Sequence, residues 1–348
     1  MSIGSRRLRT MAVSSPDRWL ASTPEGLYCI PGNFYIDPHR GVGRAIITHA
    51  HADHARAGST HVMATAETLA IMRHRLGEEA GTTQQAASYG EEVRIGEVSV
   101  RLVPAGHVLG SAQVVMEYGG SRVVVSGDYK RRSDPTCPPF EVVPCDVFVT
   151  EATFGLPVFR HPPATQEIDK ILHARHLYPE RAILVGTYSL GKCQRVILLL
   201  RQRGFDGAIW LHGALAAMCA LYTGFGFDFG DLRQATGVPR EMLKGQIVLA
   251  PPGTVADVWA RRLPDPVVGM ASGWMGVRQR ARQRGVELPI IISDHADWDE
   301  LTRTLDEMQA PEIWVTHGSE EGLMRHATLT GRRARALSLI GFDEDEGG

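Results

Sequence analysis

The segment His49-Ala-His-Ala-Asp-His54 constrains this chain more than any other feature, because it puts three imidazoles and a carboxylate within six residues. A shuffled chain of the same composition would contain such a segment roughly once in a thousand cases. Imidazole nitrogens and carboxylate oxygens are the usual ligands of Zn²⁺, and the spacing divides them, with His49 and His51 facing one way and Asp53 and His54 the other. The segment therefore predicts half of the ligands of two adjacent metal ions.

Three more short apolar runs end in further side chains that can bind metals: His107, Asp128 and His317. Taken alone, each histidine is interpreted as a hydrogen-bonded structural residue, and Asp128 as a turn residue or helix cap. Beside the histidine-rich segment they complete a metal site. Asp128 is the natural bridge between two ions, because its carboxylate has two oxygens.

The pattern of the whole chain indicates an α/β fold with helices layered around sheets. Short β-branched runs end in glycine or polar residues, and between several of them lie helical segments: 66–76, 166–176, 190–203 and 298–308. Residues 154–287 have their own alternation of strands and helices. We therefore expect a catalytic domain formed by residues 1–153 and 288–348, interrupted by an inserted α/β domain at 154–287.

Composition excludes several classes of protein. The 37 basic and 39 acidic residues give a formal net charge of −2, which excludes a protein that coats nucleic acid through bulk basicity. No apolar run reaches the ~18–20 residues of a membrane helix, so no membrane association is expected. The five cysteines form no CxxC pair and predict reduced thiols in the cytoplasm. Residues 1–19 favour a frayed basic terminus over a transit peptide, and residues 343–348 form an acidic tail.

Six motifs resemble those of the metallo-β-lactamase superfamily, and within it the β-CASP nucleases. The segment 49–54 is similar to the second superfamily motif, Gly106-His107 to the third and Ser126-Gly127-Asp128 to the fourth. Three further segments are similar to the β-CASP motifs A, B and C: Thr150-Glu151-Ala152-Thr153, Ser293-Asp294-His295 and Thr316-His317-Gly318. The resemblance covers essentially the whole chain and implies a metallo-β-lactamase αββα sandwich with an inserted α/β β-CASP domain.

Further stretches look closer to one branch, the bacterial DNA ligase-associated exonucleases: residues 23–29, 34–38 and 271–275. This branch implies a DNA exonuclease of DNA repair that acts on nucleic acid, with a functional association with a DNA ligase and a helicase.

The resemblance also implies roles for single residues. One zinc ion would be held by His49, His51, His107 and Asp128, and the other by Asp53, His54, Asp128 and His317, with Mn²⁺ as the alternative metal. Water activated between the two ions would attack the phosphodiester bond. His295 would give a proton to the leaving group as general acid, and Glu151 would hydrogen-bond His295. The resemblance also implies that Asp53 is catalytic, together with His295 and Glu151.

Phosphate contacts are expected from two kinds of position. Lys192 opens a helix after an apolar run, where free backbone N–H groups and a cation can hold a phosphate. Ser272, Gly273 and His212 also follow strand-like runs. Lys130 begins the basic triplet 130–132, which comes directly after the bridging aspartate.

Three other interpretations of the sequence remain. A histidine at motif C accompanies RNA-processing β-CASP members, so His317 favours a ribonuclease as the alternative. The same histidine-rich segment also serves hydrolases of small substrates, such as β-lactams and thioesters. A metal-free scaffold is disfavoured, since every expected ligand is present.

Overall fold

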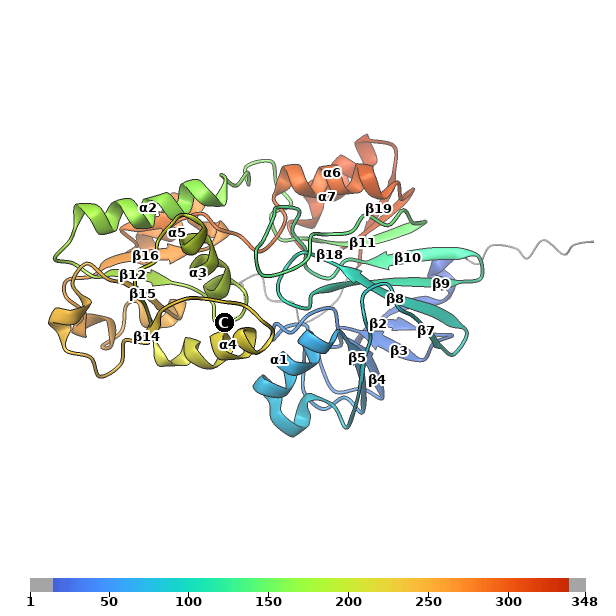
Figure 1. The fold of residues 1–348 in the computed structure, drawn as a ribbon. Coiled ribbons are helices and arrows are strands. Elements are labelled where there is room, and N and C mark those ends of the chain that lie inside the picture. Colours follow the sequence, from blue (N-terminus) through green and yellow to red (C-terminus); the bar gives the residue numbers. More distant parts are fainter. Residues whose placement is uncertain (1–14, 338–348) are drawn as a thin grey trace, which may run out of the picture.

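The structure is a computed structural model that describes residues 15–337. Most of the basic start and the acidic tail at 343–348 lie outside the described residues. The described part contains three β-sheets and seven α-helices (Figure 1). The helices are α1 (Ala66–Leu76), α2 (Ala164–Leu177), α3 (Lys192–Gln202), α4 (Gly213–Gly224), α5 (Arg278–Gln283), α6 (Trp298–Met308) and α7 (Glu320–Leu329).

The first two sheets contain the strands from both ends of the described chain. The first sheet has the order β1-β2-β3-β4-β5-β6, with β1 (Leu20–Thr23), β2 (Gly26–Cys29), β3 (Phe34–Ile36), β4 (Arg44–Ile46), β5 (His61–Ala64) and β6 (Thr83–Ala86). The second has the order β19-β18-β11-β10-β9-β8-β7, with β7 (Glu92–Ile95), β8 (Val98–Pro104), β9 (Ala112–Tyr118), β10 (Ser121–Val125), β11 (Val147–Ala152), β18 (Glu312–Gly318) and β19 (Arg333–Ala336).

These two sheets pack face to face. One buried apolar cluster joins side chains of both, including Phe34 and Ile46 from the first sheet and Val123 and Trp314 from the second. Helix α1 covers the outer face of the first sheet, while α6 and α7 cover the outer face of the second through a separate cluster. The layers are therefore α, β, β, α, and the predicted fold class is confirmed.

The third sheet is parallel throughout and is built from the middle of the chain. Its order is β14-β13-β15-β12-β16-β17, with β12 (Ile183–Gly186), β13 (Ile209–Leu211), β14 (Leu232–Gln234), β15 (Ile247–Ala250), β16 (Val267–Ala271) and β17 (Leu288–Ile290). The chain leaves the second sheet after β11 and returns in β18. These strands are parallel neighbours, with Val147 opposite Glu312, so the intervening segment is added without breaking the sheet.

The strand directions decide where the polar strand ends meet. In the second sheet β8 and β10 are both antiparallel to β9, while β10, β11 and β18 run parallel to one another. The carboxyl ends of β8, β10, β11 and β18 therefore lie at one edge of the sheet. The loop after β4 reaches the same edge from the first sheet, because the backbone N–H of Ala112 at the start of β9 donates to the carbonyl of Thr48 at 2.8 Å.

Among residues 15–337, no helix has both the length and the apolar character needed to cross a bilayer.

The packing of α6 on the second sheet gives a direct stability test. Leu305 is fully buried beneath this helix, whereas Leu329 at the end of α7 is 70% exposed. Leu305→Ala should lower the free energy of unfolding by about 2–5 kcal/mol, since it removes buried methyl groups and leaves a cavity. Leu329→Ala is the matched control, and urea denaturation measures both. Equal effects of the two substitutions would contradict the described layer.

Candidate metal centre

The loop after β4 is held in place by Asp37, a buried residue just beyond β3. The Asp37 carboxylate accepts hydrogen bonds from the backbone N–H of Thr48 at 2.8 Å and from the Thr48 hydroxyl at 2.5 Å. Its Oδ2 atom also lies 2.7 Å from Nδ1 of His54. A carboxylate that accepts from Nδ1–H leaves the Nε2 lone pair of His54 for another partner. Sequence reasoning assigned no role to Asp37, which it quoted only as part of the 34–38 stretch.

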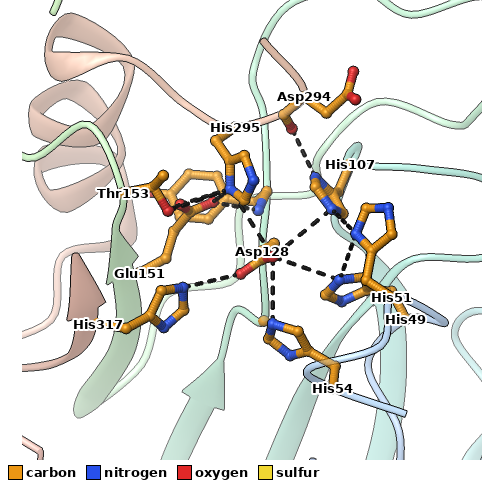
Figure 2. A network of polar contacts seen from close by, with 12 residues as sticks. His49, His51, His54, His107, Asp128, Glu151, Thr153, Asp294, His295 and His317 are labelled. Atoms are coloured by element: carbon orange, nitrogen blue, oxygen red, sulfur yellow. Dashed lines mark hydrogen bonds and ion pairs between the residues drawn. The ribbon is translucent and has the colours of Figure 1, made fainter. Parts of the chain in front are cut away.

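The first ligand group consists of His49, His51, His107 and Asp128, whose ligand atoms all lie within 4.8 Å of one another (Figure 2). Nδ1 of His51 is 3.1 Å from Nε2 of His49 and 3.0 Å from Nε2 of His107. Oδ2 of Asp128 is 3.5 Å and 3.8 Å from the same two Nε2 atoms. Ligands at the usual ~2.0–2.1 Å from a tetrahedral Zn²⁺ are ~3.3 Å apart. The donor set therefore fits a zinc-sized ion.

The second group contains His54, Asp128 and His317. Nε2 of His54 lies 3.3 Å from Oδ2 of Asp128, and Nε2 of His317 lies 3.2 Å from Oδ1 of the same carboxylate. Asp53 stands at the side of this group, with its Oδ2 atom 3.6 Å from Nε2 of His54. The Asp128 carboxylate thus faces both groups, as a bridging ligand must.

A third group joins Asp128 to Glu151 and His295. Glu151 is fully buried at the end of β11, and its two oxygens lie 3.1 Å and 2.9 Å from Nδ1 of His295. The Thr153 hydroxyl donates to Glu151 at 2.5 Å, and the backbone N–H of Tyr129 donates to it at 2.8 Å. The hydrogen bonds from Thr153 and Tyr129 therefore hold the Glu151 carboxylate against the imidazole. Sequence reasoning missed Thr153 as a functional residue.

Protonation differs between the imidazoles. Burial and the neighbouring imidazoles hold the pKa of His49 and of His107 well below the usual value, which favours the neutral, metal-binding form. Burial alone would lower the pKa of His54, but the carboxylates of Asp128, Asp53 and Asp37 raise it well above the usual value. These carboxylates therefore favour the protonated form of His54.

Glycine is required where two of the ligand loops turn. Gly106 has φ +74°, and a Cβ there would lie 2.6 Å from the carbonyl oxygen of Lys130. Gly127 has φ +56°, and a Cβ there would lie 2.7 Å from the side chain of Thr48. Each glycine directly precedes a candidate ligand. Any other residue at these two positions would place a Cβ atom too close to the neighbouring loop.

A pocket opens over the three groups, and the middle segment of the chain supplies part of its wall. The metal-ligand side is formed by His51, Asp53, His107, Asp128 and His317. The opposite side includes Tyr188 and Leu190, from the loop between β12 and α3, and Trp274, whose ring packs on Phe154 at 4.8 Å between centroids. The aromatic walls of this pocket were not predicted from the sequence.

Two predicted phosphate contacts are corrected by the structure. Lys192 is fully buried, and its Nζ atom lies 3.0 Å from the Asp294 carboxylate and donates to the Ile292 carbonyl at 2.8 Å. Lys130 is 1% exposed, and its Nζ atom lies 2.6 Å from Asp134. Neither ammonium faces the pocket, because buried carboxylates nearby attract both.

The remaining predicted contacts lie outside the pocket wall. Ser272 caps the short helix η6 (Gly273–Gly276) by accepting from the N–H of Trp274, and Gly273 is packed against Phe154. His212 caps α4 and stacks edge-on with Trp259. The basic triplet is also engaged: Arg131 and Arg132 pair with acidic side chains of the 297–307 region. None of these predicted contacts lines the pocket, although Trp274, which follows Gly273, does.

Comparison with known proteins finds several relatives by sequence. No family model matches the chain. A protein named "Probable DNA ligase" from Opitutus terrae is 28% identical over 305 residues, which are 86% of this chain and 29% of the relative. This chain thus spans about three-tenths of that relative's length. Ribonuclease TTHA0252 of Thermus thermophilus is 27% identical over 89% of each chain. Cleavage and polyadenylation specificity factor subunit 3 of Dictyostelium discoideum is 23% identical over 68% of this chain and 37% of its own length.

Among solved structures, a protein of unknown function from Enterococcus faecalis V583 has the same fold. Its TM-score is 0.55 at 15% identity, over 86% of this chain and 80% of that one. The sequence relatives are β-CASP proteins, and the resemblance that the motifs indicated is confirmed. Over most of its length this chain is similar to proteins of the metallo-β-lactamase superfamily, and within that class to β-CASP proteins.

The proton on His54 predicts how metal binding depends on pH. Binding must displace this proton, so the affinity for Zn²⁺ should rise as the pH rises through neutrality and above, towards the raised pKa of His54. Calorimetric titration with Zn²⁺ at pH 7 in two buffers of different ionisation enthalpy should give different apparent enthalpies, because a proton is released. Identical enthalpies in both buffers would contradict this assignment.

Proposed function

We propose that this chain is a metal-dependent nuclease that hydrolyses phosphodiester bonds of DNA, most simply as an exonuclease of DNA repair. The observation that carries the proposal is a pocket lined by five of the seven proposed metal ligands and by His295, whose Nδ1 atom lies 2.9 Å from Glu151. Small-substrate hydrolysis needs the metals but gives no reason for that pair. The middle segment, for which we propose boundaries 154–287, adds aromatic walls that suit an extended substrate.

The residues fit two zinc or manganese ions, held by the two groups that share Asp128. Bound divalent ions would activate water at neutral pH and offset charge on the phosphate oxygens. Of the remaining ligands, we assign Asp53 to the second group beside His54. This gives each group a carboxylate and at least two imidazoles.

His295 is the proposed proton donor. Glu151 can only accept from Nδ1, so this contact fixes the tautomer and favours the charged imidazolium. A positioned donor of this kind contributes ~10²–10⁴-fold when the leaving group is a poor alkoxide. Thr153 keeps the carboxylate turned towards the ring, and its hydroxyl lies 3.4 Å from the same nitrogen.

DNA is favoured over RNA by the match to a protein named as a DNA ligase, which covers 86% of this chain. RNA is the second candidate, because the relative named as a ribonuclease covers 89% of both chains. We further propose that the chain works beside a DNA ligase and a helicase in the reducing cytoplasm, where its five free thiols remain reduced.

One experiment tests the nuclease and its substrate together. End-labelled single-stranded DNA, duplex DNA and RNA are incubated with the wild type and with Asp128→Ala, with Zn²⁺ or Mn²⁺ supplied. The wild type should shorten DNA stepwise, and Asp128→Ala should not, since the shared carboxylate is gone. Faster cleavage of RNA would select the second candidate. If every nucleic acid stays intact while a thioester or lactam is hydrolysed, the nuclease proposal fails.

The role of the Glu151–His295 pair has its own test. Glu151→Gln keeps the shape of the side chain but removes the charge, so turnover should fall about 100-fold or more while metal content stays at the wild-type level. Glu117→Gln is the matched control on the same sheet, since its side chain is 48% exposed. Near wild-type turnover of Glu151→Gln would show that the pair is only structural.

A further inference from the structure

Five charged side chains form a buried ionic cluster below the metal-ligand loops: Lys130, Asp134, Lys192, Arg195 and Asp294. They come from the loop after β10, the first turn of α3 and the loop after β17. Lys192 is 0%, Lys130 and Arg195 1% and Asp294 5% exposed, and the Asp134 side chain is 2% exposed. The cluster therefore ties together three segments that are distant in the sequence.

Each charge in the cluster has several partners. Arg195 lies between the two carboxylates, with Nε 3.2 Å from Asp134 and Nη1 3.1 Å from Asp294. Lys192 pairs with the other oxygen of Asp294 at 3.0 Å, and Lys130 pairs with Asp134 at 2.6 Å. Three cations and two carboxylates leave one positive charge in excess, which backbone carbonyls must satisfy.

Those carbonyls belong to the site. Lys130 donates to the carbonyl of His107 at 2.6 Å, Lys192 donates to Ile292 at 2.8 Å, and Arg195 donates to Ser293. Ile292 and Ser293 lead directly into Asp294 and His295. All three cations therefore donate to backbone carbonyls at or near His107 and His295.

Asp294 links the cluster to the metal ligand itself. Its carbonyl oxygen lies 2.7 Å from Nδ1 of His107, and a carbonyl can only accept, so Nδ1 carries the hydrogen and Nε2 presents its lone pair to the first ligand group. Figure 2 shows this contact between the two residues. The next residue, His295, faces Glu151. One short loop therefore orients a metal ligand and the proposed proton donor.

Helix α3 is pressed against the ligand loop at its first residues. Gly191, which precedes Lys192, has φ +84°, and a Cβ there would lie 2.4 Å from Cγ1 of Val108. This close approach brings the two α3 cations under His107. Stability alone does not account for the cluster, because apolar residues of similar volume commonly stabilise a core as well as buried ions do.

We propose that Lys192 and Arg195 of the middle segment are positioning residues, which act through Asp294 to hold His107 and His295 in place. The inference rests on the proposed metal centre. By this account the middle segment supplies no ligand in the first group, yet it orients one. Partners of this kind, which hold a ligand without touching the metal, typically change metal affinity 10–100-fold when removed.

The test compares Lys192→Met with Lys244→Met, in the full chain, by titration with Co²⁺ followed through its visible absorption. Lys244 precedes β15, its side chain is 38% exposed, and it pairs with the exposed Glu180 and Glu241. Lys192→Met should bind Co²⁺ about 10–100-fold more weakly and with a changed spectrum, whereas Lys244→Met should match the wild type. Equal affinities and spectra in all three proteins would overturn the proposal.

A double variant separates positioning from stability, including the case in which Lys192→Met fails to fold. Lys192→Met with Asp294→Asn removes one charge of each sign, so the cluster keeps its excess of one positive charge, and the thermal stability lost by taking Lys192 away from the Asp294 carboxylate should largely return. Under the proposal, Co²⁺ affinity stays low in the double variant, since the loop is no longer held. Recovery of both properties together would overturn the positioning role. If the wild type itself binds no Co²⁺, the proposed metal centre fails first.

Discussion

The carboxylate of Asp128 is the contact on which the rest of the site depends. Imidazoles from both sheets face it: His49 and His54 from the first, and His107 and His317 from the second. They can meet there because the carboxyl ends of β8, β10, β11 and β18 share one edge. Five charged or chargeable groups at such distances repel or pair strongly, and a cation bound between them would satisfy all of them.

The middle segment contributes directly to the candidate site. It gives the pocket its aromatic wall through Trp274 and Tyr188, and it places two buried cations beneath the loop that carries His295. Because β11 and β18 are parallel neighbours, the segment leaves and returns at the same edge where the ligands gather. Its position in the chain therefore places the middle segment next to the candidate metal ligands.

Sequence patterns predicted some elements better than others. The helices α1 and α6 begin and end where their periodicity indicated, and in the structure Thr65 and Asp297 accept the hydrogen bonds that cap their first turns. Helix α4 was not predicted, because it consists largely of alanine and other apolar residues without an amphipathic period. The short strands β1–β3, of three or four residues each, were also missed, since they are defined by pairing with one another rather than by their own composition.

The sequence by itself determined the candidate metal site: a segment with three histidines and an aspartate within six residues admits few other uses, and strand ends supplied the remaining donors. It could not decide which cations face a substrate. Lys192 and Lys130 looked like phosphate contacts because a lysine's charge is visible in a sequence and its burial is not. Only the tertiary structure brought Asp294 beside Lys192, 102 residues away in the sequence, and buried Lys130 together with Asp134, which is four residues away from it. Buried carboxylates then outcompete solvent for both ammonium groups, since charges attract more strongly where water is excluded.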